Sequence, residues 1–249
     1  MALSSNITTD PSSVLESPRT GAGPMAAVWK PGGLIYLVAC VLGLLVGLFV
    51  HSIFPPRYTQ AAPLPTLSAL AVAQGLFILL GWPLLCLWRT QHATTRRFAA
   101  ESVVEAVAWT LWALPLLIAA TWLANATVAD AIRTALAVAA LWPLAIAAGS
   151  LMRARPSLRP AVMLTLLVLA ALPALWYVWR EFLRAMPADW LWNLAPATNL
   201  WQAGAARQSN ILPTPAWPQI AWFAAAAATW TLAAMGRGRP EGPAALGRG

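Results

Sequence analysis

The chain has 249 residues, of which 59% are hydrophobic and only 10% are charged. A water-soluble domain carries about a quarter charged residues, so this composition excludes an ordinary soluble enzyme. The net charge of +8 would suit a nucleic-acid partner. However, the basic residues stand in small groups between long apolar runs, which is typical of membrane topology and not of nucleic-acid binding. Cys40 and Cys86 both lie inside apolar runs and indicate neither a disulfide framework nor a metal site.

Six stretches reach the length of about 20 apolar residues that a transmembrane helix needs. In chain order they are Gly33–Phe54, Leu67–Trp88, Glu101–Ala124, Ala131–Met152, Pro160–Arg180 and Trp217–Met235. Since strand-like alternation is absent, we expect an all-α polytopic membrane protein whose single transmembrane domain covers residues 30–235. The tails, residues 1–29 and 236–249, are rich in small and turn-forming residues and are predicted to be disordered.

The distribution of basic residues predicts the orientation of the six spans. With the N-terminus in the cytoplasm, the inner segments hold eleven of the sixteen Lys and Arg residues and the outer segments hold five. Cytoplasmic loops are enriched in Lys and Arg. We therefore expect a multi-pass protein of the cell (inner) membrane with both termini in the cytoplasm.

Spans two to five each contain one internal proline. These are Pro83, Pro115, Pro143 and Pro173. A proline inside a helix removes one backbone hydrogen bond and bends the helix. Four bent helices favour a bundle that moves around a pathway, although proline is also simply common in membrane helices.

Motifs for chemistry are absent from the sequence. His51 and His92 fall at opposite membrane faces, and neither HExxH nor a Walker motif is present. Once Glu101, Glu105 and Arg133 are assigned to span ends, the middles of the spans hold no charged residue, which argues against a proton-coupled carrier. We expect no enzymatic activity, no catalytic residue, no cofactor and no metal.

The predicted inner loop between spans two and three is basic and then becomes helical. Its charged residues are Arg89, Arg96, Arg97, Glu101 and Glu105. Arg97 and Glu101 stand four residues apart and can pair on one helix face. The loop is interpreted either as a solvated positive-inside loop or as a short amphipathic helix that docks onto a cytoplasmic partner.

The predicted outer segment before the last span, residues 181–216, is unusually apolar for a loop. Its notable residues are Trp190, Trp192, Asn193, Pro196, Asn199 and Trp201. Such a segment either anchors at the interface through its aromatic residues or re-enters the bilayer, where its backbone must be shielded by protein. Because Pro196 interrupts it, two short helices fit better than one.

The whole arrangement resembles the permease subunits of ABC-2-type transporters in topology over residues 30–235. The outer stretch Asn193-Leu-Ala-Pro196-Ala-Thr-Asn199 is similar to that family's penultimate loop. Arg96-Arg97-Phe-Ala-Ala-Glu101 keeps the charges of the family's inner loop but lacks its Gly-Thr. The resemblance implies a permease that forms a homo- or heterodimer in the lipid bilayer and is driven by a separate cytoplasmic ATPase, with the inner loop as coupling helix. The alternative is a non-catalytic scaffold or assembly subunit of a larger membrane complex.

Overall fold

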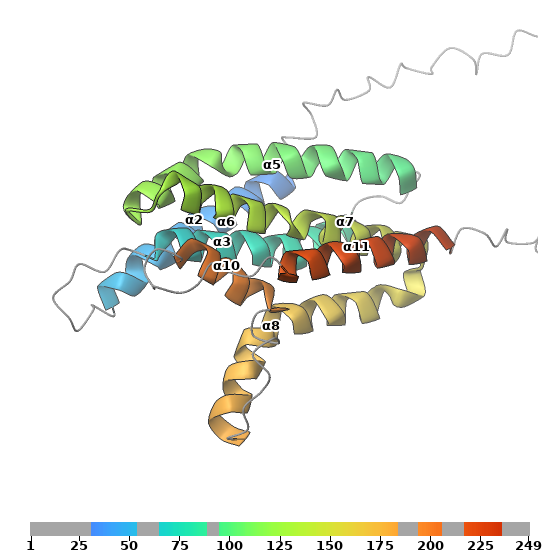
Figure 1. Cartoon of the computed structure of the whole chain (residues 1–249). Helices are drawn as coiled ribbons and strands as arrows, with labels where there is room; N and C mark the ends of the chain where they lie inside the picture. Colours follow the sequence, from blue (N-terminus) through green and yellow to red (C-terminus); the bar gives the residue numbers. More distant parts are fainter. Residues whose placement is uncertain (1–30, 54–64, 89–94, 184–193, 206–216, 236–249) are drawn as a thin grey trace, which may run out of the picture.

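The structure is a computed structural model that describes residues 31–53, 65–88, 95–183, 194–205 and 217–235. All regular elements within these ranges are helices, which confirms the all-α prediction (Figure 1). The elements are α2 (Pro31–Ile53), α3 (Thr66–Leu76), η2 (Phe77–Gly81), α4 (Trp82–Trp88), α5 (Thr95–Leu123), α6 (Val128–Ala139), α7 (Leu141–Ala154), η3 (Pro156–Leu158), α8 (Arg159–Leu183), α10 (Pro196–Ala205) and α11 (Trp217–Met235).

Five helical stretches are long and apolar enough to cross a membrane. They are Pro31–Phe49, Thr66–Leu87, Phe98–Leu123, Val128–Ala154 and Pro156–Leu175. These five coincide with the first five predicted spans, so the protein is a helical bundle with several candidate transmembrane helices. The sixth predicted span is helical within the same bounds, as α11, but it is not among the five. The number six therefore stays a prediction.

Two of the four internal prolines interrupt the α-helical hydrogen-bond pattern. Pro143 has no N–H that could donate to the Ala139 carbonyl. Span four is therefore divided into two helices, α6, which ends at Ala139, and α7, which begins at Leu141. Before Pro83, the helix loosens into the π-helical η2, in which the Trp82 N–H bonds to the Phe77 carbonyl five residues back. α5 and α8 continue through their prolines, and α8 bends part-way along its length (Figure 1).

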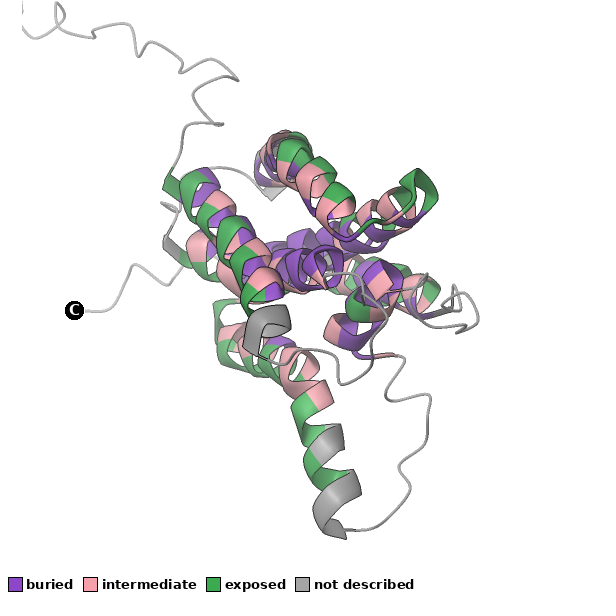
Figure 2. Cartoon of the chain, turned by 90° about the vertical axis from the view of Figure 1, so that its left-hand side faces the viewer, coloured by how far each residue is buried: buried purple, intermediate pink, exposed green. Residues whose placement is uncertain are grey.

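The helix formed by α3, η2 and α4 lies at the centre of the bundle and contacts α2, α5, α6, α7, α8 and α10. Its first turn contacts the C-terminal end of α5, where the Thr66 hydroxyl donates to the Ala120 carbonyl at 2.9 Å. Buried residues gather where the helices face one another, whereas α8 is largely exposed (Figure 2). In its apolar stretch, Pro156–Leu175, only 6% of the residues are buried.

The bundle has two ends, which we name after one residue each. At the Arg153 end, the guanidinium of Arg153 in α7 lies 4.7 Å from the ring centroid of Phe98 in α5. At the Asp130 end, α6 begins with a capping box, in which Thr127 and Asp130 exchange side-chain and backbone hydrogen bonds. By the predicted topology, the Arg153 end faces the cytoplasm and the Asp130 end faces outward.

Candidate functional site: an aromatic cluster and a docked short helix

Six aromatic side chains from four spans form one cluster in the core. They are Tyr36, Phe77, Trp82, Phe98, Trp109 and Trp142. Neighbouring ring centroids lie between 5.2 Å (Tyr36–Phe77) and 6.4 Å (Tyr36–Trp142) apart. These separations fall in the range in which tilted and edge-to-face aromatic pairs attract each other. The cluster joins α2, η2, α4, α5 and α7, so a shift of one helix changes the contacts of the others.

Polar groups lie among the buried residues of the same helices. Glu105 on α5 is 1% exposed, and Ser102 and Ser150 are fully buried. The indole N–H groups of Trp82 and Trp109 and the hydroxyl of Ser150 have no hydrogen-bond partner among the described residues. A buried donor without a partner costs about 1–3 kcal/mol. The bundle therefore holds buried donors for an acceptor group and one buried carboxyl group, so this region is not a purely apolar core.

Glu105 lies deeper than the sequence suggested. The membrane-compatible stretch of α5 begins at Phe98, so Glu105 is seven residues, about 10 Å, inside it. Its burial places the side chain inside the bundle and not on a surface that a cytoplasmic protein can reach. Ionisable residues inside membrane helices are rare and often mark functional sites.

The other residues of the predicted coupling loop lie on the first two turns of α5 or before it. Arg89 is outside the described residues, whereas Arg96 and Arg97 belong to α5 and Glu101 is half-buried. α5 starts at Thr95 and runs without interruption into the membrane-compatible stretch. The helical part of the predicted loop is thus the start of the third span itself. The coupling role of these residues stays a prediction.

Most of the described part of the predicted outer segment lies between Leu194 and Ala205. Trp190, Trp192 and Asn193 lie outside the described residues. α10 begins at Pro196, where the missing N–H of proline costs no hydrogen bond. Pro196 and Asn199 are buried, whereas Trp201 is 43% exposed.

α10 is tied to both neighbouring elements. It packs mainly against α3, and a Cβ on Gly204 would lie 2.7 Å from the Ser68 Cα, so the two backbones are in close contact there. The Gln219 side chain of α11 donates to Asn199 Oδ1 at 2.9 Å, and the Trp222 indole donates to the Leu194 carbonyl at 3.3 Å. α10 is thus held within the bundle at the Asp130 end.

Comparison of the chain with protein-family models, with curated proteins and with solved structures found no match. Among the described residues, no group of three or more His, Cys, Asp or Glu side chains could hold a metal ion.

Sequence reasoning missed the close packing of α2 on α3. A Cβ on Gly47 would lie 2.7 Å from the Thr66 Cα, and one on Gly43 would lie 3.1 Å from the Ala69 carbonyl oxygen. The spacing Gly43-x-x-x-Gly47 was the available signal, since small residues four apart allow membrane helices to approach closely. The aromatic cluster had no comparable signal, because tryptophan is spread along the whole chain.

Proposed function

We propose that this protein is the membrane-spanning permease subunit of an ATP-driven transporter, energised by a separate cytoplasmic ATPase. The observation that carries the proposal is α10, a short helix placed between the fifth and sixth predicted spans and docked into the bundle through Gly204 and Asn199. A buried helix in this position suits a segment that re-enters the outer leaflet and closes one end of a pathway. The six-span topology with both termini in the cytoplasm belongs to the same proposal.

The start of α5 supports a cytoplasmic partner. It carries Arg96 and Arg97 immediately before Phe98, where the membrane-compatible stretch begins. In a continuous helix, force applied at the basic first turn is transmitted along the axis to Glu105 and Trp109. An ATPase that pushes on this turn would therefore move the aromatic cluster. A dimer of the chain, each subunit with its own ATPase, fits this scheme.

Site-specific photo-crosslinking in cells tests the proposal. A photoreactive residue at Arg97 should capture a protein with a Walker motif. The same residue at Ile118, a 68% exposed position five residues before the end of α5, should capture none. The purified complex should hydrolyse ATP, and Arg97→Glu should weaken its assembly. Crosslinks from Arg97 only to other integral membrane proteins would favour the scaffold alternative instead.

A further inference from the structure

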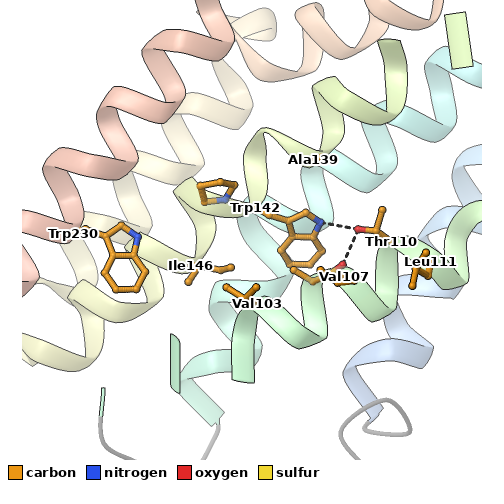
Figure 3. Close-up of a pocket in the computed structure, with 10 residues that line it drawn as sticks. Val103, Val107, Thr110, Leu111, Ala139, Trp142, Ile146 and Trp230 are labelled. Atoms are coloured by element: carbon orange, nitrogen blue, oxygen red, sulfur yellow. Dashed lines mark hydrogen bonds between the residues drawn. The ribbon is translucent and has the colours of Figure 1, made fainter. Parts of the chain in front are cut away.

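A groove runs along the side of the bundle between α5 and α11, with α6 and α7 as its floor. One part has a volume of about 460 Å³, and its walls include Val107 and Leu111 of α5, Trp142 of α7 and Trp230 of α11 (Figure 3). A second part, of about 420 Å³, lies between α6 and α11 toward the Asp130 end. Ala139 lines both parts, so they adjoin at this residue, and together we name them the groove.

The first part of the groove is lined almost entirely by apolar side chains. Its one hydroxyl, on Thr110, donates to the Ala106 carbonyl at 2.7 Å and accepts from the Trp142 indole at 3.2 Å (Figure 3). The α5 wall consists of exposed apolar side chains, among them Val103, Val107 and Leu111. α5 and the stretch that contains α6 and α7 are long and apolar enough to cross a membrane, so we place the open side of this part toward hydrocarbon. The chemistry of this part matches an acyl chain.

The second part of the groove is polar at its far end. Arg133 and Gln219 line it, together with apolar residues that include Leu136 and Phe223. The Arg133 side chain is 38% exposed, and its single described ion pair, with Asp130, is long at 3.5 Å. Asp130 Oδ2 is itself occupied by the Thr127 hydroxyl and N–H. The guanidinium has five N–H donors, and most of them remain available to an anion at the mouth of the groove.

The dimensions of the groove agree with one leaflet of a bilayer. From Arg133 to Ile146 there are thirteen residues, which at helical rise span about 20 Å. From the headgroup region to the midplane, one leaflet measures about 20–22 Å, half of a bilayer of about 40–45 Å. A lipid with its headgroup at Arg133 would thus lay one acyl chain through both parts of the groove.

We propose that this groove is a binding site for one anionic phospholipid of the leaflet at the Asp130 end, with its phosphate at Arg133 and one acyl chain along Ala139 and Trp142. Basic pockets between transmembrane helices bind the headgroups of anionic lipids. The inference does not rest on the transport proposal, since such a lipid can bind to a permease or to a scaffold equally.

The test uses the full chain in lipid nanodiscs with phosphatidylglycerol that carries a photoreactive group on its acyl chain. Phosphatidylcholine with the same acyl chain is the neutral control. Mass spectrometry locates the labelled peptides. We expect phosphatidylglycerol to label the groove residues Val107, Trp142 and Trp230 about fivefold more than phosphatidylcholine does, the preference that one basic residue gives near a membrane surface. Exposed positions on α8, such as Leu164, should show no preference.

Two substitutions separate the headgroup contact from the acyl contact. Arg133→Gln should abolish the fivefold preference in the groove, whereas Arg155→Gln, at the opposite end, should leave it unchanged. Ala139→Phe fills the exposed junction of the two parts and should lower groove labelling by both lipids. Ala161→Phe, at an exposed position of α8, is the matched control and should not lower it.

Three results would overturn the proposal. One is that, in the wild-type protein, the groove and α8 are labelled equally and neither prefers one headgroup. This result would mean that only bulk lipid contacts the groove, and it does not depend on the folding of any variant. Another is competition by soluble glycerophosphate at the same concentration, which would mean a site for free phosphate. The last is that lipid does not label the groove residues because another segment of the chain or a second copy of the protein covers them.

Discussion

The close contact between α10 and α3 leads to a quantitative prediction for Gly204→Ala. The new Cβ would lie 2.7 Å from the Ser68 Cα and N and 2.8 Å from its Oγ. Two of these atoms are backbone, so one helix must shift. Overpacking costs about 1–3 kcal/mol, and the better helix propensity of alanine returns at most about 1 kcal/mol. We therefore expect docking of α10 to weaken by about 1–2 kcal/mol.

A shift of this size is measurable as cysteine accessibility. In a background without Cys40 and Cys86, Thr198→Cys places a thiol at a buried position of α10 with little change in volume. Because labelling follows the population of the undocked state when docking is fast, Gly204→Ala should raise the labelling rate about 5- to 30-fold. Trp201→Cys, at an exposed position, should label at the same rate with and without the substitution.

Ala205→Val provides the matched control. It adds more volume than Gly204→Ala does, on the neighbouring residue, but at a half-buried position. It should change the labelling of the cysteine at position 198 less than twofold. If Gly204→Ala leaves that labelling at the parent rate, α10 does not dock on α3 through this contact, and the permease proposal loses its main support.

Three further predictions follow from the fold. Gly43→Val should destabilise the packing of α2 on α3 by about 1–3 kcal/mol, seen as a lower melting temperature in detergent, whereas Leu42→Val on the exposed face should have little effect. A double-mutant cycle of Trp142→Phe and Thr110→Val should give a coupling free energy of about 0.5–1.5 kcal/mol, and a value of zero would mean that the hydrogen bond of 3.2 Å contributes nothing. Reporter fusions after Gln91 and Ser157 should report the cytoplasm and those after Ala61 and Gln208 the outer side; an outer signal at Ser157 would rule out the six-span topology.

The positions of the helices could be predicted from the sequence alone. Whether a stretch can cross a membrane depends on its length and summed apolarity, which are local properties. The first five predicted spans therefore coincide with helices of the structure, with ends that differ by a few residues. The start of α10 at Pro196 is also local, since proline tolerates the first helical position and disrupts the interior of a helix.

The inward faces of these helices depended on tertiary structure. In a soluble helix the apolar stripe marks the buried face, but a membrane helix is apolar on all sides, so its sequence does not show which side meets protein and which meets lipid. Thus Glu105, assigned to a span end from the sequence, is buried in the bundle. Arg133 and Trp142 are nine residues apart in the chain. They line parts of one groove only because α11 packs against α7 and lies across from α6. Contacts between side chains of distant segments arise from helix packing. Hydropathy is a sum over neighbours in the chain, so it contains no information about these contacts.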